Sequence, residues 1–585
     1  MKMLRLVLAA LLVVSMIFSV AACGNATQTD TASTAAAGSS DAAATVEAAS
    51  TAPAVEKDAE TGLTPMADRS PFTYTLFIRD PGQAPSKDNP VLKKITELTG
   101  VTVDFQFLVG DLNEKVGVLL AGGDYPDVMF GAEAKKFFDA GALIPVEDYI
   151  NKYPNLKAHY APFMKSMIAA LDGKHAYCVE NYNAFPNTTP PIFNVGGVGF
   201  FMQKAVVQDS GYKIPKTLDE YFKMLEDYKA KYPTIDGAKT IGFEILCDGW
   251  RDFCLRNPAQ HLMGAGNDGD AYVDPNTLVA SLYQNTDTAK AYYLKLNEEY
   301  RKGIIEAETF TENYDQYIAR LSTGAVLGMF DQAWNFGNGT NALNSAGKFE
   351  RTYVAVPITN PGVKDNYIDP PAKTISGTGG LTVSTSAKNP DRIFAFWDWL
   401  LNPEVQNYLQ WGIEGKDWTK VGTVGKALTK ERRDINRDNA KRRDTTGDTL
   451  WQYTPKMQGL YDDGAPCGPG DSADEYLASQ SEFDQKFLKD MNIQFPAQIL
   501  STPTQRPAYY PVWSFPLEDG SPAKVATNKI ADTCRKYYPQ LILSDPSKFD
   551  ALWDKFLKEI ESDNPNAYLD EINKQIKAKM ELAKQ

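Results

Sequence analysis

The sequence predicts a mixed α/β fold with a helical C-terminal end. A strand, a helix and a second strand follow one another between residues 73 and 108, which is the βαβ unit of an α/β sheet. Further helix-initiating signals occur along the rest of the chain and are frequent near its C-terminus. Of the 585 residues, 43% are hydrophobic and 23% are charged, so most of the chain has the composition of a globular protein.

The chain begins with a segment that is typical of a signal peptide, residues 1–22. Lys2 and Arg5 precede an apolar run over residues 6–20 that is shorter than a membrane span. The sequence VAAC that follows resembles a bacterial lipobox and ends at Cys23. The resemblance implies cleavage before Cys23 and diacylation of its sulfur, which would hold the protein at the membrane. The alternative is ordinary cleavage after small residues, in which Cys23 has no role.

Residues 23–69 are predicted to form a disordered tether rich in Ala, Ser and Thr. Its sizeable apolar side chains are few and follow no regular period: Val46, Val55, Leu63 and Met66. Such a segment buries too little apolar surface to offset the entropy lost on ordering it. As a flexible coil it would reach roughly 35–40 Å, enough to hold a folded body near a membrane.

The folded body is predicted to begin near residue 70 with alternating strands and helices. These elements are a strand at 73–78, a helix begun by Asn89-Pro90, a strand at 101–108, a helix at 112–121 and a short strand at 127–130. Residues 101–108 alternate apolar and polar side chains at period two, and Gly100 ends the preceding helix. A βαβ arrangement implies that the two longer strands lie parallel in one sheet.

Later helices are predicted from residues that favour the first turn of a helix. The signals are the capping-box sequence that starts at Thr217, and the pairs Asn389-Pro390, Asn402-Pro403, Asp545-Pro546 and Asn564-Pro565. The helix after residue 390 carries apolar side chains at helical spacing, Ile393, Phe394, Trp397, Leu400 and Leu401, which predicts a buried face.

The composition disfavours several classes of function. A net charge of −14 argues against a nucleic-acid partner, because phosphates require a basic surface. Three histidines and six cysteines leave little from which to build a metal centre, and no cofactor is predicted. Residues 434–438 alternate oxygen-bearing side chains but lack the glycine and glutamate of a calcium loop, so no metal site is predicted. Cys247 and Cys254 either form a disulfide or remain buried thiols.

A colinear series of segments resembles family 1 bacterial extracellular solute-binding proteins, the ligand-capturing subunits of carbohydrate ABC importers. The most specific segment is LLAGGDYPDV at 119–128, which resembles the helix-to-strand junction of that family. The others are GALIPVEDYI at 141–150, DGK at 172–174, GAVLGMFDQAW at 324–334 and GIEG at 412–415. Residues 425–510 match no part of the family pattern.

The resemblance implies a two-lobed, periplasmic-binding-protein-like fold of type II whose lobes are joined by crossing hinge segments. Lobe one would comprise residues 70–185 and 370–410, and lobe two would comprise residues 190–365 and 411–585. The ligand would lie in the cleft between the lobes. Closure around the ligand would shift the population from open to closed, and a permease could read that closure.

A sugar receptor needs flat aromatic side chains for the C–H faces and planar polar groups for the hydroxyls. Ten residues of these types occur outside predicted regular elements or at their ends. They are Arg79, Asp124, Tyr125, Trp250, Arg251, Asp331, Trp334, Asn335, Trp411 and Glu414. Each also has a structural interpretation, because most aromatic side chains pack in cores and many acids bind their own loops. Trp513 is a weaker candidate of the same kind.

The resemblance implies a non-catalytic receptor that captures a carbohydrate and delivers it to ABC importer permease subunits. The size of the body favours an oligosaccharide. We expect a monomer, anchored through the lipid on Cys23 to the extracellular face of the cell membrane. Two alternatives remain at this point: a peptide-binding receptor of an ABC importer, and a surface glycoside hydrolase, which would need two carboxylates across a cleft.

Overall fold

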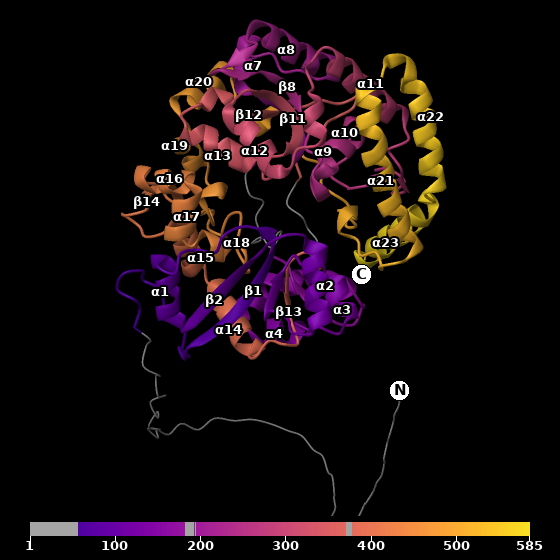
Figure 1. Ribbon diagram of the computed structural model, residues 1–585. Helices are drawn as coiled ribbons and strands as arrows, with labels where there is room; N and C mark the ends of the chain where they lie inside the picture. The colour runs from indigo at the N-terminus through magenta and orange to yellow at the C-terminus, as the bar shows by residue number, and fades with distance from the viewer. Residues whose placement is uncertain (1–55, 182–191, 194, 370–376, 585) are drawn as a thin grey trace, which may run out of the picture. The chain divides into compact units, whose positions relative to one another are not determined.

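Two separate β-sheets organise the computed structural model (Figure 1). The structure describes residues 56–181, 192–193, 195–369 and 377–584, all within the compact unit Val55–Gln585. The predicted signal peptide, Cys23 and most of the predicted tether lie outside the described residues. Within these described ranges, no helix is long and apolar enough to cross a membrane.

The first sheet has five strands in the order β2-β1-β3-β13-β4. Their bounds are β1 Phe72–Pro81, β2 Val101–Leu108, β3 Val128–Phe130, β4 Cys178–Val179 and β13 Leu381–Val383. Strand β1 runs parallel to both β2 and β3, with Leu76 opposite Val128, whereas β13 is antiparallel to β3. The predicted βαβ unit is therefore confirmed, and a strand from much later in the chain completes the sheet.

The second sheet has four strands in the order β12-β5-β11-β8. Their bounds are β5 Val198–Gln203, β8 Ile241–Glu244, β11 Val326–Gln332 and β12 Tyr353–Val356. Strands β8 and β11 are parallel, and β5 is antiparallel to β11 and to β12. The chain passes from the first sheet to the second after β4 and returns before β13. Residues 182–191 and 370–376, which lie in these two passages, are outside the described residues.

Each sheet has its own hydrophobic core. The first core joins β1, β3 and β13 to α14 (Pro390–Leu400), where Ile393, Phe394 and Trp397 are fully buried as predicted. The second core joins β5, β8 and β11 to α8 (Leu218–Lys231), α11 (Asp287–Arg301), α21 (Pro522–Leu543), α22 (Pro546–Ser562) and α23 (Pro565–Leu582). The C-terminal end is helical, as predicted from the sequence.

The predicted helix starts are largely confirmed. Asn89 caps α1 (Pro90–Thr99) through its side chain, and Gly100 ends that helix at φ 72°, in the left-handed region. The predicted helix at 112–121 is α2 (Leu112–Gly122), and α15 spans Pro403–Trp411. The Thr217 hydroxyl accepts from the Glu220 amide at the start of α8, but the Glu220 carboxylate accepts from Lys216 rather than closing the capping box.

The folded part starts earlier than the predicted boundary at residue 69. Leu63 is 2% exposed and belongs to the first core. Lys94 pairs with Asp58 at 3.4 Å and with Glu60 at 3.3 Å, and Trp399 donates its indole proton to the Thr64 carbonyl. The sequence alone did not reveal these contacts, because all of their partners lie on helices distant in the chain.

Residues 411–585 pack against both cores. Leu450 and Tyr453 belong to the core of the first sheet, whereas Phe487 and most of the buried apolar residues after it belong to the core of the second. Between these stretches lie the helices α16 Lys430–Arg437, α17 Asn439–Thr445, α18 Asp448–Gln452, α19 Ala473–Ser479 and α20 Glu482–Asp490. This range does not pack as a part of one lobe alone, in contrast to the expectation, and the residue ranges of the two lobes stay a prediction.

Candidate functional site

Two loops meet at the carboxyl edge of the second sheet. Because β8 and β11 are parallel, their C-terminal ends lie at the same edge. The loop after β8 leads into the short 3₁₀ helix η2 (Gly249–Asp252), and the loop after β11 leads into α13 (Gly337–Ser345). Ligands of α/β sheets commonly bind at such an edge. The predicted candidates Trp250, Arg251, Trp334 and Asn335 all lie on these two loops.

Trp250 and Trp334 form what we call the indole platform. Their rings are nearly parallel, at an interplanar angle of 14° with 5.8 Å between the centroids, and each residue is 53% exposed. Phe253 lies 6.3 Å from both rings and is almost fully buried. The Trp334 indole donates to the Gln332 side chain at 2.7 Å, which fixes the orientation of its ring. Two large, ordered aromatic faces are therefore open to solvent at the edge of the sheet.

Arg251 lies beside the platform between two aromatic rings. Its guanidinium carbon is 4.5 Å from the centroid of Trp250 and 4.2 Å from that of Tyr314, the first residue of α12 (Tyr314–Thr323). Its Nε donates to the Asn335 side chain at 3.0 Å. Within the described part of the chain Arg251 forms no ion pair. Its remaining donors are therefore held in place and are not committed to a carboxylate of the protein.

Asp331 and Asn335 support this arrangement from below. Asp331 is fully buried and accepts hydrogen bonds from the Tyr317 hydroxyl at 2.6 Å, the Asn335 amide at 2.9 Å and the Cys254 thiol at 3.3 Å. Burial raises the pKa of Asp331, although these hydrogen bonds oppose the shift. Asn335 is 1% exposed and links Asp331 to Arg251. Both residues were predicted to contact ligand; the structure instead places them as positioning groups beneath the surface.

Local sequence explains how the two loops are held together. Gly249 has a φ of 55°, a left-handed backbone conformation that residues with a side chain rarely adopt. The glycine therefore lets the chain turn sharply before Trp250. Asn313 caps α12, and the Asp248 carboxylate accepts from the Tyr314 amide at 2.9 Å. Tyr314 in turn donates to the Asn335 carbonyl at 2.7 Å. Tyr314 was not predicted, because no motif marks it and its role depends on a contact across the fold.

The structure does not bring the first-sheet candidates together. Arg79 lies near the carboxyl end of β1 and donates to the carbonyl of Gly131, just after β3, at 3.3 Å. Asp124 and Tyr125 precede β3, so they lie at the opposite edge of the same parallel pair. Tyr125 is half-buried and packs edge-on against Phe137 at 5.8 Å. The role of these three residues in binding stays a prediction.

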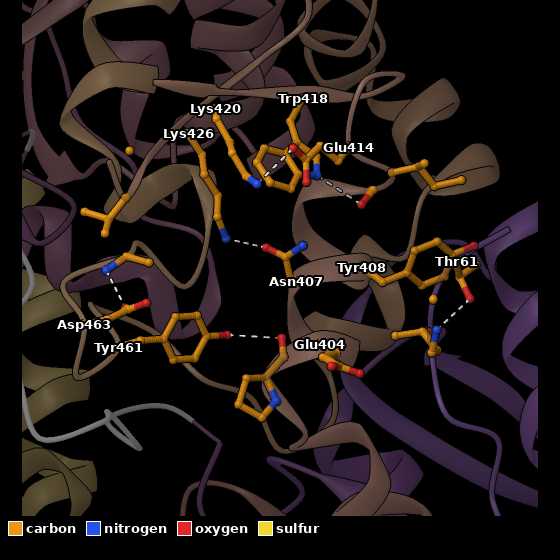
Figure 2. Close-up of a pocket in the computed structure, with 18 of the residues that line it drawn as sticks. Thr61, Glu404, Asn407, Tyr408, Glu414, Trp418, Lys420, Lys426, Tyr461 and Asp463 are labelled. Carbon is orange, nitrogen blue, oxygen red and sulfur yellow. Dashed lines mark hydrogen bonds and ion pairs between the residues drawn. The ribbon is translucent and has the colours of Figure 1, made fainter. Parts of the chain in front are cut away.

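Glu414 belongs to a different pocket (Figure 2). It has a volume of about 690 Å³ and lies between α15, residues 60–63 and the hairpin of β14 (Trp418–Val421) and β15 (Gly425–Leu428). Glu414 is half-exposed and pairs with Lys420 at 3.3 Å. Trp411 is fully buried and donates to the Cys467 carbonyl at 3.2 Å. The ring of Trp411 packs beneath the hairpin, a burial that does not support its predicted ligand contact, which stays a prediction.

Trp513 is a third exposed tryptophan, at 60%, on the 3₁₀ helix η7 (Val512–Ser514). All nine tryptophans lie within the described ranges, and Trp250, Trp334 and Trp513 are the ones that are more than half exposed. Cys247 and Cys254 are free thiols, which settles the alternative left open by the sequence. In the described ranges no group of three or more His, Cys, Asp or Glu residues could hold a metal ion.

Comparisons with known proteins agree with this architecture. The model of the family described as bacterial extracellular solute-binding protein matches residues 91–413, more than half of the chain. The fructooligosaccharide ABC transporter substrate-binding protein FusA of Streptococcus pneumoniae is 29% identical over 240 residues. The polygalacturonan/rhamnogalacturonan-binding protein YtcQ of Bacillus subtilis is 27% identical over 161 residues. These matches cover 39% and 26% of this chain, and they span 44% and 30% of the relatives' own lengths.

Solved structures show the same fold over most of the chain. The FusA complex with kestose superposes with a TM-score of 0.60 and 19% identity, over 87% of this chain and 99% of that one. An HMO-binding, ABC-transporter-associated solute-binding protein from Bifidobacterium longum infantis gives a TM-score of 0.58 and 15% identity, over 87% and 99%. The two sheets thus form the α/β fold of two-lobed solute-binding proteins. Together with the family match, this shows that the chain belongs to the bacterial extracellular solute-binding protein family.

Proposed function

We propose that the protein captures a carbohydrate, in particular an oligosaccharide, and delivers it to the permease of an ABC importer. The observation that carries this proposal is the indole platform with Arg251 beside it. The C–H face of a pyranose or furanose ring packs on flat aromatic surfaces, and its hydroxyls accept hydrogen bonds from a held guanidinium. Both features are present at the carboxyl edge of the second sheet.

The names of the relatives support the same class of ligand. FusA is a fructooligosaccharide-binding transporter subunit, and YtcQ binds polygalacturonan or rhamnogalacturonan. The sequence match to each relative covers only part of this chain and part of the relative. Their ligands differ in sugar type and charge, but all are glycans of several units. We therefore extend the class of ligand, and not the individual sugar, to this protein.

The site is better suited to binding than to hydrolysis. A glycoside hydrolase presents two carboxylates to the scissile bond, separated by about 5–10 Å. At the platform the strand-end carboxylate is Asp331, which is fully buried and accepts several hydrogen bonds. Asp248 accepts from the amide at the start of α12. The Asp331 carboxylate is thus closed off from a sugar and one oxygen of Asp248 is held by the amide of α12, which favours a receptor without turnover.

We further propose that Cys23 carries the lipid and that the segment after it tethers the receptor to the extracellular face of the cell membrane. The lipobox-like VAAC supports this proposal. Asp58 already pairs with Lys94 at 3.4 Å, so the tether would be shorter than predicted. A monomer is expected. A Cys23→Ala variant should lose incorporation of labelled palmitate and leave the membrane fraction.

Ligand-dependent thermal stabilisation tests the central proposal. Mono- and oligosaccharides and short peptides are each added to the intact protein, and its melting temperature is recorded. A ligand stabilises the native state by a free energy that grows with the logarithm of its concentration relative to its dissociation constant, so a binder in large excess should raise the melting temperature by several degrees. Product analysis of the same samples should show unchanged glycans.

The control is the Trp250→Ala, Trp334→Ala double variant, which should fold normally and lose the stabilisation by glycans. Stabilisation by peptides alone would instead support the peptide receptor. Released sugar products would support the hydrolase. A wild-type protein that no carbohydrate stabilises would contradict the proposal.

A further inference from the structure

A second cavity lies next to the platform, beneath α13. It has a volume of about 800 Å³, within the range of pockets that hold small organic ligands. We call it the α13 cavity; its walls come from β12, α13, α16, α19 and α20. Ala333 and Gly337, on either side of Trp334, both line it. Since a residue spans at most about 3.6 Å of chain, Gly337 lies within roughly 11 Å of Trp334.

Three basic and three acidic side chains line this cavity, and four of the six form two ion pairs. Lys204 pairs with Asp484 at 2.6 Å, and both side chains are less than 15% exposed. Arg433 binds Glu475 through two hydrogen bonds of 2.8 and 2.7 Å. A charged ligand would have to compete with these partly buried pairs. The cavity therefore favours a neutral ligand.

Several uncharged polar groups of the cavity have no partner in the part of the chain that the structure describes. The Thr340 hydroxyl oxygen is buried and makes no hydrogen bond. The side-chain amides of Asn344 and Asn436 make none either, and both residues are half-buried. A buried polar atom without a partner costs on the order of 1–3 kcal/mol, so a ligand that satisfies the Thr340 hydroxyl gains up to that free energy, and the half-buried amides add less. A side-chain amide has a donating NH₂ group and an accepting oxygen, so it can form hydrogen bonds with a hydroxyl, which both donates and accepts.

Aromatic side chains form another part of the lining. Phe336 is 5% exposed, stands directly after Asn335 and packs edge-on against Tyr353 at 5.8 Å. Phe349 and Tyr476 also border the cavity. Neutral amides and hydroxyls among aromatic rings are the surroundings that a sugar ring prefers. The same chemistry thus recurs in a second place, close to the platform.

We infer that the α13 cavity takes further units of the same glycan, so that the protein selects neutral oligosaccharides longer than the platform alone can hold. This inference rests on the proposed function. It concerns the length and charge of the glycan, which the platform does not determine. Arg251, which forms no ion pair within the described residues, can bind neutral and acidic sugars alike. The cavity adds selection for length and for absence of charge.

Calorimetric titration of the wild-type protein with two homologous series tests this inference. One series is fructooligosaccharides and the other is oligogalacturonates, each from the disaccharide to the hexasaccharide. We expect the affinity for the neutral series to rise about tenfold or more between the shortest and the longest member, and that for the acidic series to stay flat.

The critical variant is Asn344→Trp, which fills the cavity. It should bind the short neutral members as the wild type does and lose the gain with length. The matched control is Ala342→Trp on the same helix, at an exposed position outside the cavity, which should keep that gain. Should Asn344→Trp fail to fold, the Asn344→Ala, Asn436→Ala variant removes the hydrogen-bonding groups and should reduce the gain several-fold.

The outcomes separate the two proposals. Glycan binding that does not depend on length, or an undiminished length dependence in both cavity variants, would overturn the inference and leave the proposed function intact. A stronger gain for the acidic series would also overturn it. A wild-type protein that binds no member of either series and no glycan of the thermal screen would contradict the proposed function, and the cavity proposal with it.

Discussion

The molecule contains two tryptophan pairs, each with a basic side chain beside it, and they differ in what covers them. Trp250 and Trp334 lie 5.8 Å apart with Arg251 against one ring, and both are 53% exposed. Trp411 and Trp418 lie 6.1 Å apart with Lys426 over both rings, and they are 0% and 5% exposed. The same residue types thus form an open surface in one place and a closed core in the other.

The difference arises from the segments that pack over each pair. The hairpin of β14 and β15 folds over Trp411, and its own Trp418 donates to the Gly412 carbonyl at 3.3 Å. Nothing equivalent in the described ranges covers the platform, which lies at the edge of the second sheet. Exposed aromatic side chains that are held in place by ordered neighbours are available to bind a ligand. Buried aromatic side chains contribute instead to the stability of the fold.

Truncation of the closed pair, Trp411 and Trp418, should produce the largest effect, which is on the free energy of unfolding. Trp411→Ala removes a fully buried indole and should lower the free energy of unfolding by about 3–5 kcal/mol. Trp250→Ala removes a half-exposed ring and should cost less than about 1 kcal/mol. Urea denaturation of the two variants measures this contrast. Equal losses of stability would show that exposure does not separate the two pairs.

Truncation of the open pair should instead affect binding. Trp334→Ala removes one stacking face and should weaken glycan affinity about 10- to 100-fold, which corresponds to roughly 1.4–2.8 kcal/mol. Calorimetric titration with a glycan that stabilises the wild type provides the measurement. Tyr232→Ala, an exposed aromatic on neither pair, is the control and should bind as the wild type does. An unchanged affinity for Trp334→Ala would remove the platform from the binding site.

Arg251, the basic residue beside the open pair, should contribute less to glycan affinity than Trp334 does. Arg251→Lys keeps the charge but loses the planar group that lies between Trp250 and Tyr314 and donates to Asn335. We expect affinity to fall about threefold to tenfold, the equivalent of one hydrogen bond, with little change in melting temperature. Equal affinity of Lys and Arg at this position would show that only charge matters there.

The basic residue of the closed pair should have the smallest effect. Burial lowers the pKa of Lys426 below its ordinary 10.5. Lys426→Met keeps the packing and removes the cost of burying a charge, so stability at neutral pH should be unchanged or higher by up to about 1 kcal/mol. Glycan affinity should stay the same.

The pH dependence of this last variant has a definite sign. In the window just below pH 10.5 the unfolded chain holds a proton on Lys426 that the folded protein has already released. The stability of the wild type should therefore rise with pH relative to Lys426→Met in that window. Denaturation curves of both proteins at several alkaline pH values test it; a falling difference would mean that the folded state favours the charged lysine.

The sequence could predict those features that depend on neighbouring residues. The βαβ unit, the helix caps at Asn89 and Asn389 and the buried face of α14 all follow from local patterns, and the structure confirms them. Trp250 and Arg251 were chosen as candidate ligand-binding residues in the same way, because glycine and polar residues beside a tryptophan indicate a turn. The family resemblance was likewise carried by short motifs in order along the chain.

Other predictions depended on contacts that no local pattern contains. Glu414 and Trp411 stand three residues apart, yet one faces solvent and the other is buried, because the hairpin closes over only one of them. Asp331 and Asn335 resemble ligand-binding residues in sequence but lie under the surface. Leu63 appeared as part of a tether until the first core supplied its neighbours.

By itself the sequence determined the class of the fold, the positions of its main helices and strands, and the kind of chemistry its loops offer. Periodicity and capping act over a few residues, so they can be read without knowledge of the whole. The tertiary structure alone decided which tryptophans are open, which carboxylates are buried, and that a neutral cavity lies beside the platform. Exposure depends on which distant segments pack together, and that is a property of the complete fold.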